Sequence, residues 1–76
     1  MMKVKDMLQV EMDFPETLRM WREKRYLTQI QLAEKAMIGI TSVRAYETGK
    51  VESTLGALKL LSKALNISVS TLVKNV

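Results

Sequence analysis

The stretch TQIQLAEKAMIGITSVRAYETGK, which runs from Thr28 to Lys50, decides how this chain folds. Apolar residues recur at helical spacing in its first part and predict a helix from Gln29 to Ala36. One face of that helix carries Leu32, Ala33 and Ala36, which we expect to be buried. Because Ala33 is small, a second helix can approach closely at this point.

A second helix is predicted from Ile40 to Thr48. Val43 and Tyr46, with Ile38 just before the helix, supply its buried side. Four residues are left on the opposite, outward side: Ile40, Thr41, Arg44 and Ala45. Two short helices, a tight turn between them and a mixed exposed face on the second helix are the layout of a helix-turn-helix.

The same stretch resembles the helix-turn-helix of the phage repressor, Cro and Xre family of DNA-binding regulators. The resemblance rests on Thr28-Gln29, on Leu32-Ala33-Glu34-Lys35 and on Glu47-Thr48-Gly49-Lys50, and it extends from about Leu18 to Leu72. It implies an all-α, five-helix domain with a lambda-repressor-like fold. The chain departs from the family at Met37, because relatives usually carry Gly in this turn.

Composition excludes several other classes of protein. The 76 residues suffice for one domain and contain no Cys and no His, which removes disulfides, the common metal ligand and the common general base. We find no paired carboxylates and no phosphate loop, so we expect neither an enzyme nor a cofactor or metal site. No apolar run approaches a membrane span, and the first residues are not a signal peptide, so a cytoplasmic protein is expected.

Charge is divided unevenly along the chain, whose net charge is +4. Residues 1–16 have a balance of −2, from two Lys against four Asp and Glu, and residues 17–76 have a balance of +6, from ten bases against four acids. The basic part is the part that resembles a DNA-binding domain, as attraction to phosphate requires.

The N-terminal segment, residues 1–14, is interpreted as an arm, and residues 15–76 as the helix-turn-helix domain. From Leu8 to Phe14 apolar and polar residues alternate, which predicts a short β-strand. This strand either pairs with a second copy, in an antiparallel homodimer, or rests its apolar face on the helices. Pro15 disfavours a helical extension. Dimerisation through the last helix and its Leu72, as in relatives, is the competing interpretation.

Three further helices complete the predicted domain. The first runs from Pro15 to about Tyr26, with Pro15 in its first turn. The next, from Leu55 to Leu65, is capped by Thr54 and ended by Asn66, and the last, from Val69 to about Lys74, is capped by Ser68. The expected core stripe of the fourth helix is Leu55, Leu58, Leu61, Ala64 and Leu65.

The second helix of the motif is expected to read DNA. The candidates for base contacts are Ile40, Thr41, Arg44 and Ala45, since Arg can bind guanine bidentately and Thr and Ile methyl groups can touch thymine. The alternative for Arg44 is a phosphate contact or a solvated surface charge. The expected phosphate contacts are Gln29, Gly39, Thr48 and Lys50, and the roles of Gln29 and Lys50 are those that the resemblance to the family implies. Gln29 as a solvated residue of the first helical turn is the alternative. The resemblance also implies a partly buried bidentate ion pair between Arg22 and Glu47.

These observations favour a sequence-specific DNA-binding transcriptional regulator of bacterial or phage type, acting as a homodimer on a two-fold operator. The alternative is a protein-interaction module, such as an antitoxin or a partner of another regulator, that keeps the fold. The outward side of the second helix supports that alternative, because Gly39, Ile40 and Ala45 offer no hydrogen-bonding side chains.

Overall fold

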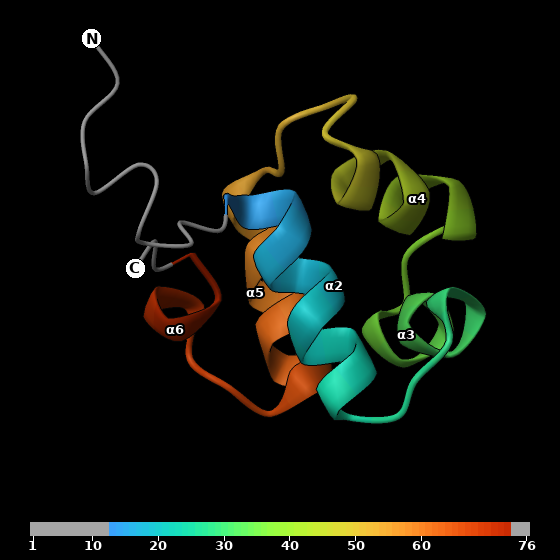
Figure 1. Ribbon diagram of the computed structural model, residues 1–76, viewed down its shortest axis with the longest axis vertical. Helices are drawn as coiled ribbons and strands as arrows, with labels where there is room; N and C mark the ends of the chain where they lie inside the picture. The colour runs from blue at the N-terminus through green and yellow to red at the C-terminus, as the bar shows by residue number, and fades with distance from the viewer. Residues whose placement is uncertain (1–12, 74–76) are drawn as a thin grey trace, which may run out of the picture.

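The computed structural model describes residues 13–73, which form five helices and, within that range, no strand (Figure 1). The helices are α2 (Phe14–Lys24), α3 (Gln29–Ala36), α4 (Ile40–Thr48), α5 (Leu55–Leu65) and α6 (Val69–Val73). The expected all-α, five-helix architecture is confirmed, and α3, α4 and α5 have the predicted bounds. The predicted β-strand arm lies, up to Met12, outside the described residues.

The helices enclose a single apolar core. In Figure 1, α2 and α5 lie at the centre, with α3 and α4 on one side of them and α6 on the other. α2 packs on α4 and α6, and α5 packs on α3 and α6, while α3 also contacts α4. Six side chains are completely buried in the core: Leu18, Leu32, Val43, Leu61, Leu65 and Leu72. Each contributes on the order of 1.5–3 kcal/mol by leaving water.

Side-chain caps explain why most of the helix starts could be predicted. The hydroxyl of Thr28 accepts a hydrogen bond from the backbone N–H of Gln31, whose side chain accepts one from the N–H of Thr28 in return. Thr54 caps α5 through the N–H of Ala57, and Ser68 caps α6. At the end of α5, Asn66 adopts the predicted left-handed conformation.

The predicted bounds of the first helix were wrong at both ends. Phe14, which the alternating pattern assigned to the arm, is the first residue of α2, because the Asp13 carboxylate accepts a hydrogen bond from the N–H of Glu16 and caps the helix there. The helix ends at Lys24 instead of Tyr26. Tyr26 has a left-handed backbone, with φ 59°, and cannot continue the helix.

One expectation about α5 is also corrected, and the position of Leu72 in α6 bears on a second. Leu55 was placed in the core stripe but is 62% exposed. Leu72 was the candidate contact for dimerisation through the last helix. It is completely buried in the core of the protomer, so its side chain is not available to a second copy in this structure.

Met37 closes α3 in a left-handed conformation, with φ 59° and ψ 42°. This backbone costs a non-glycine residue about 1–2 kcal/mol. The Met37 side chain is 81% exposed, so packing within the protomer does little to offset the strain.

We therefore expect Met37→Gly to stabilise the protomer by about 1 kcal/mol, after allowance for the greater freedom of glycine in the unfolded chain. Thermal unfolding in dilute solution should show a melting temperature about 4–8 °C higher. Met37→Ala is the matched control, because it keeps the Cβ and thus the strain, and its melting temperature should stay near that of the wild type. A lower melting temperature for Met37→Gly would mean that the methionine side chain contributes more than its backbone strain costs.

Candidate nucleic-acid interface

The outward face of α4 is exposed and slightly concave. Thr41 and Arg44 are exposed, and Ala45 is half-buried between them and the helix core. With Thr48 and Lys50 these residues line a shallow depression of about 250 Å³. Five of the eight residues predicted at the DNA surface are thus brought together, four from α4 and Lys50 from the loop that follows it.

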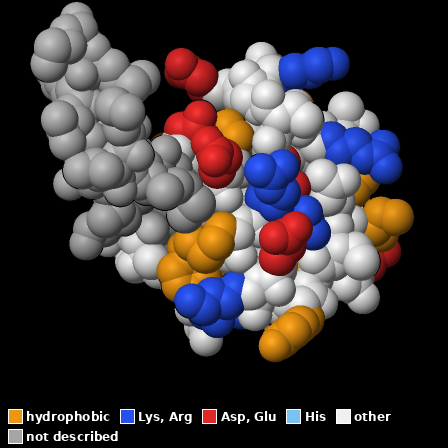
Figure 2. All heavy atoms as spheres, in the orientation of Figure 1, with side chains coloured by type: hydrophobic (Ala, Val, Ile, Leu, Met, Phe, Trp, Pro, Cys, Tyr) orange, Lys and Arg blue, Asp and Glu red, His pale blue; other side chains and the backbone are white. Residues whose placement is uncertain are grey.

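Charge on this face is positive. Between Gly39 and Lys50 the bases Arg44 and Lys50 are exposed, and the only acid in that stretch, Glu47, is buried and bonded to Arg22 and Gln29. Over the face of the protein shown in Figure 2, acidic and basic side chains are intermixed. The outward side of α4 therefore attracts phosphate locally, although the whole surface is not uniformly basic.

Ile40 does not lie where the sequence pattern placed it. It was expected to be exposed on the outward face, but it is half-buried and packs against the core. Only part of its surface remains open to an apolar contact with a base.

Gly39 precedes α4 as its N-cap and provides no side-chain acceptor for the first turn. A Cβ added at this position would meet no atom within 4 Å, so the backbone here lies at an open surface. Backbone N–H groups at such a helix start are suited to binding a phosphate oxygen.

Thr48 is less available than expected. Its hydroxyl donates to the carbonyl oxygens of Arg44 at 2.8 Å and Ala45 at 3.3 Å, within the same helix. The single hydroxyl proton is therefore engaged, and donating it to a phosphate requires rotation about the side-chain bond.

Lys50 follows Gly49, whose φ of 75° turns the chain sharply at the end of α4. This turn places exposed Lys50 at the rim of the depression, beside Thr48. The backbone N–H of Lys50 donates to the carbonyl of Ala45 and fixes the start of the following loop.

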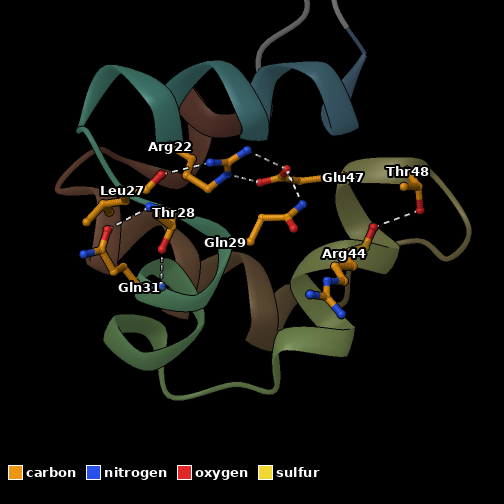
Figure 3. Close-up of polar contacts among 8 residues, drawn as sticks. All are labelled: Arg22, Leu27, Thr28, Gln29, Gln31, Arg44, Glu47 and Thr48. Carbon is orange, nitrogen blue, oxygen red and sulfur yellow. Dashed lines mark hydrogen bonds and ion pairs between the residues drawn. The ribbon is translucent and has the colours of Figure 1, made fainter.

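Behind α4, a hydrogen-bonded network joins three helices (Figure 3). Arg22 of α2 donates to Glu47 of α4 twice, from Nε to Oε2 at 2.6 Å and from Nη2 to Oε1 at 3.1 Å. Its Nη1 donates to the carbonyl of Leu27 at 2.9 Å. The side chains are 12% exposed for Arg22 and 2% for Glu47, so the Arg22–Glu47 contact is the partly buried bidentate pair that the family resemblance implied.

Gln29 is the third member of this network. Its Nε2 donates to Glu47 Oε1 at 3.0 Å, which links the first turn of α3 to the last turn of α4. One N–H and the carbonyl of the Gln29 amide remain for other partners. Sequence reasoning missed this bond, because it named Gln29 for phosphate and Glu47 for Arg22 and nothing in the spacing connects them. In Figure 3, Arg44 points away from the network.

The sequence signature of the helix-turn-helix family matches residues 18–72. This chain belongs to that family. Its members of the phage repressor and Xre type are DNA-binding transcription regulators, and not enzymes as a class.

Individual proteins of known sequence or structure are also similar to this chain. It is 34% identical over 62 residues to the HTH-type transcriptional activator BcrR of Enterococcus faecalis, covering 82% of this chain but only 30% of that relative. Among solved structures it resembles the restriction-modification controller protein C.AhdI from Aeromonas hydrophila, with a TM-score of 0.76 and 29% identity over 78% of this chain and 89% of the other. It also resembles the P22 c2 repressor in complex with a synthetic operator, with a TM-score of 0.76 and 27% identity over 83% and 96% of the two chains.

None of the helices formed by residues 13–73 has the length and apolar character needed to cross a membrane. Within the same residues, no three acidic side chains come together as they would have to in order to hold a metal ion.

Proposed function

We propose that this chain is a sequence-specific transcription regulator that binds a two-fold DNA operator as a homodimer, with α4 in the major groove. The observation that carries the proposal is the exposed, positive and acid-free outward face of α4, formed around Arg44 and Thr41. The Arg22–Glu47–Gln29 network supports it from behind by fixing α4 against α2 and α3. Such a protein is expected to act in the cytoplasm.

The small number of polar side chains on α4 favours a dimer. One helix with two polar outward residues specifies few base pairs, whereas two copies place two such helices about one turn of DNA apart. The similar P22 c2 repressor was solved in complex with a synthetic operator, which supports DNA binding as such.

Selection of bound fragments from genomic DNA of the source organism tests the proposal. We expect recovered fragments to share a sequence with two-fold symmetry. The affinity for that sequence should fall steeply as salt rises, because bound phosphates release counterions. Failure to enrich any sequence, together with weak binding that does not depend on salt, would refute the proposal.

Within this function, Lys50 is proposed to contact a phosphate. Lys50→Ala should weaken binding to operator and to random DNA by the same factor, and it should reduce the salt slope by about one unit per protomer. Lys59→Ala, on the exposed side of α5, is the matched control and should leave both quantities unchanged. A loss confined to the operator would assign Lys50 to base recognition instead.

A protein-interaction module, such as an antitoxin or a partner of another regulator, is the second candidate. It is favoured by the modest polar content of the α4 face, where Gly39, Ala45 and half-buried Ile40 provide no hydrogen-bonding side chains. For such a module we expect α4 substitutions to abolish binding to the protein partner, with no sequence preference in DNA binding.

A further inference from the structure

A second concave surface lies between α3 and α5. It encloses about 260 Å³ and is lined by Lys35, Ala36, Met37, Leu60, Lys63 and Ala64. We name it the lysine groove. It shares no lining residue with the depression on α4.

The lysine groove is apolar in the middle and positive at its edges. Ala36 and Ala64 are buried beneath it, whereas Leu60 is 37% exposed. Lys35 and Lys63 are both exposed, and no acidic residue lines the groove. A surface of this kind fits a segment that carries both apolar and acidic side chains.

Met37 adds an exposed apolar side chain to this surface. It is 81% exposed. The flexible thioether of Met37 adapts well to an apolar partner.

We propose that the lysine groove binds residues 6–12 of a second copy of this chain. That segment, Asp-Met-Leu-Gln-Val-Glu-Met, contains two acids and no base. Leu8, Val10 and Met12 alternate with polar residues, so an extended segment directs all three to one face. This face would cover Met37 and Leu60, while Lys35 and Lys63 at the edges attract Asp6 and Glu11.

A larger groove of about 400 Å³ lies closer to the segment, at the start of α2, and we name it the acidic groove. Its lining includes Asp13 and Glu52 and no Lys or Arg. It therefore repels Asp6 and Glu11, and charge selects the lysine groove instead.

The chain's own residues 6–12 cannot fill its lysine groove, because the segment is attached at the other groove. Asp13 lines the acidic groove, and the Cα atom of Met12 is about 3.8 Å from that of Asp13. The two grooves lie on different sides of α5, since Leu58 lines the acidic groove, Leu60 lines the lysine groove, and two residues correspond to about 200° around a helix. Reciprocal exchange of the segments closes a two-fold dimer. The inference thus rests on the proposed homodimer and specifies which residues join its two copies.

A spin label tests the contact in the full-length protein. The chain has no cysteine, so Gln9→Cys gives one attachment point for a nitroxide. Labelled protein is mixed with isotope-enriched wild-type protein, and only the enriched copy is observed by NMR. We expect signal loss at the amides of Met37, Leu60 and Ala64, with recovery when the nitroxide is reduced. Loss at Val51 and Val73, loss confined to residues 6–12, or no loss would each overturn the inference.

Charge reversal tests it independently. Lys35→Glu with Lys63→Glu should raise the dimer dissociation constant, measured by sedimentation, on the order of tenfold. The reason is that the lysine groove of each protomer loses its attraction to Asp6 and Glu11 of the other. Adding Asp6→Lys and Glu11→Lys to the same chain should return the dissociation constant to near its wild-type value. The control, Arg19→Glu with Lys59→Glu, makes the same change in net charge outside the groove and should leave the constant unchanged. Circular dichroism verifies that each variant is folded.

The outcomes separate this inference from the proposed function. No effect of the groove charges, or no rescue by the reversed segment, would overturn the inference, as would a wild-type protein that stays monomeric. Signal loss at the groove in a protein that enriches no operator would refute the proposed function alone.

Discussion

Glu47→Ala is expected to destabilise the fold by about 3–5 kcal/mol. The substitution leaves the Arg22 guanidinium, whose side chain is only 12% exposed, without its acceptor in a site from which water is largely excluded. The amide of Gln29 loses its partner in the same step. Because small domains are stable by only about 5–15 kcal/mol, thermal or urea unfolding should reveal the loss directly.

A double substitution distinguishes the net contribution of the Arg22–Glu47 pair to stability from the penalty of leaving one of its charges buried alone. Arg22→Met combined with Glu47→Leu removes both charges and fills the site with apolar side chains, so it should recover most of the stability that Glu47→Ala loses. Gln29→Ala removes only the outer hydrogen bond and should cost about 0.5–1.5 kcal/mol. If Glu47→Ala unfolds at the wild-type temperature, the network contributes nothing measurable to folding.

The helix bounds were predictable wherever a side chain signals them locally. Thr28 and Thr54 act as caps through their own hydroxyl groups, and Asn66 ends α5 in a conformation that it tolerates well. The exceptions occur where the decisive group is remote or atypical. Tyr26 is left-handed although tyrosine gives no sign of it, and Leu55 is exposed although it continues the apolar stripe of α5.

The candidate site was predictable to a similar degree. Periodicity alone placed Thr41 and Arg44 outward, and both are exposed. It placed Ile40 outward as well and failed there, because the contact of Ile40 with the core depends on the angle between α3 and α4, which the sequence does not encode locally. The bond from Gln29 to Glu47 spans 18 residues and has no periodic signal at all.

Arg44→Ala is expected to have the largest effect on recognition. A guanidinium that binds guanine through two hydrogen bonds discriminates against other bases by about 1–3 kcal/mol, so the variant should lose that much preference at one base pair of each half-site. Competition between the selected operator and random DNA, at one fixed salt concentration, measures the loss.

Arg44→Lys is the matched control, because it keeps the charge but not the planar pair of donors. It should therefore retain most of the affinity for random DNA and still lose the base preference. Arg44 is well placed for this role, since it is exposed, extends away from the Arg22–Glu47–Gln29 network and has no acidic residue beside it in the depression on α4. Equal losses on operator and random DNA for Arg44→Ala, with none for Arg44→Lys, would show that the arginine contacts a phosphate, and base reading would then rest on Thr41 and the exposed part of Ile40.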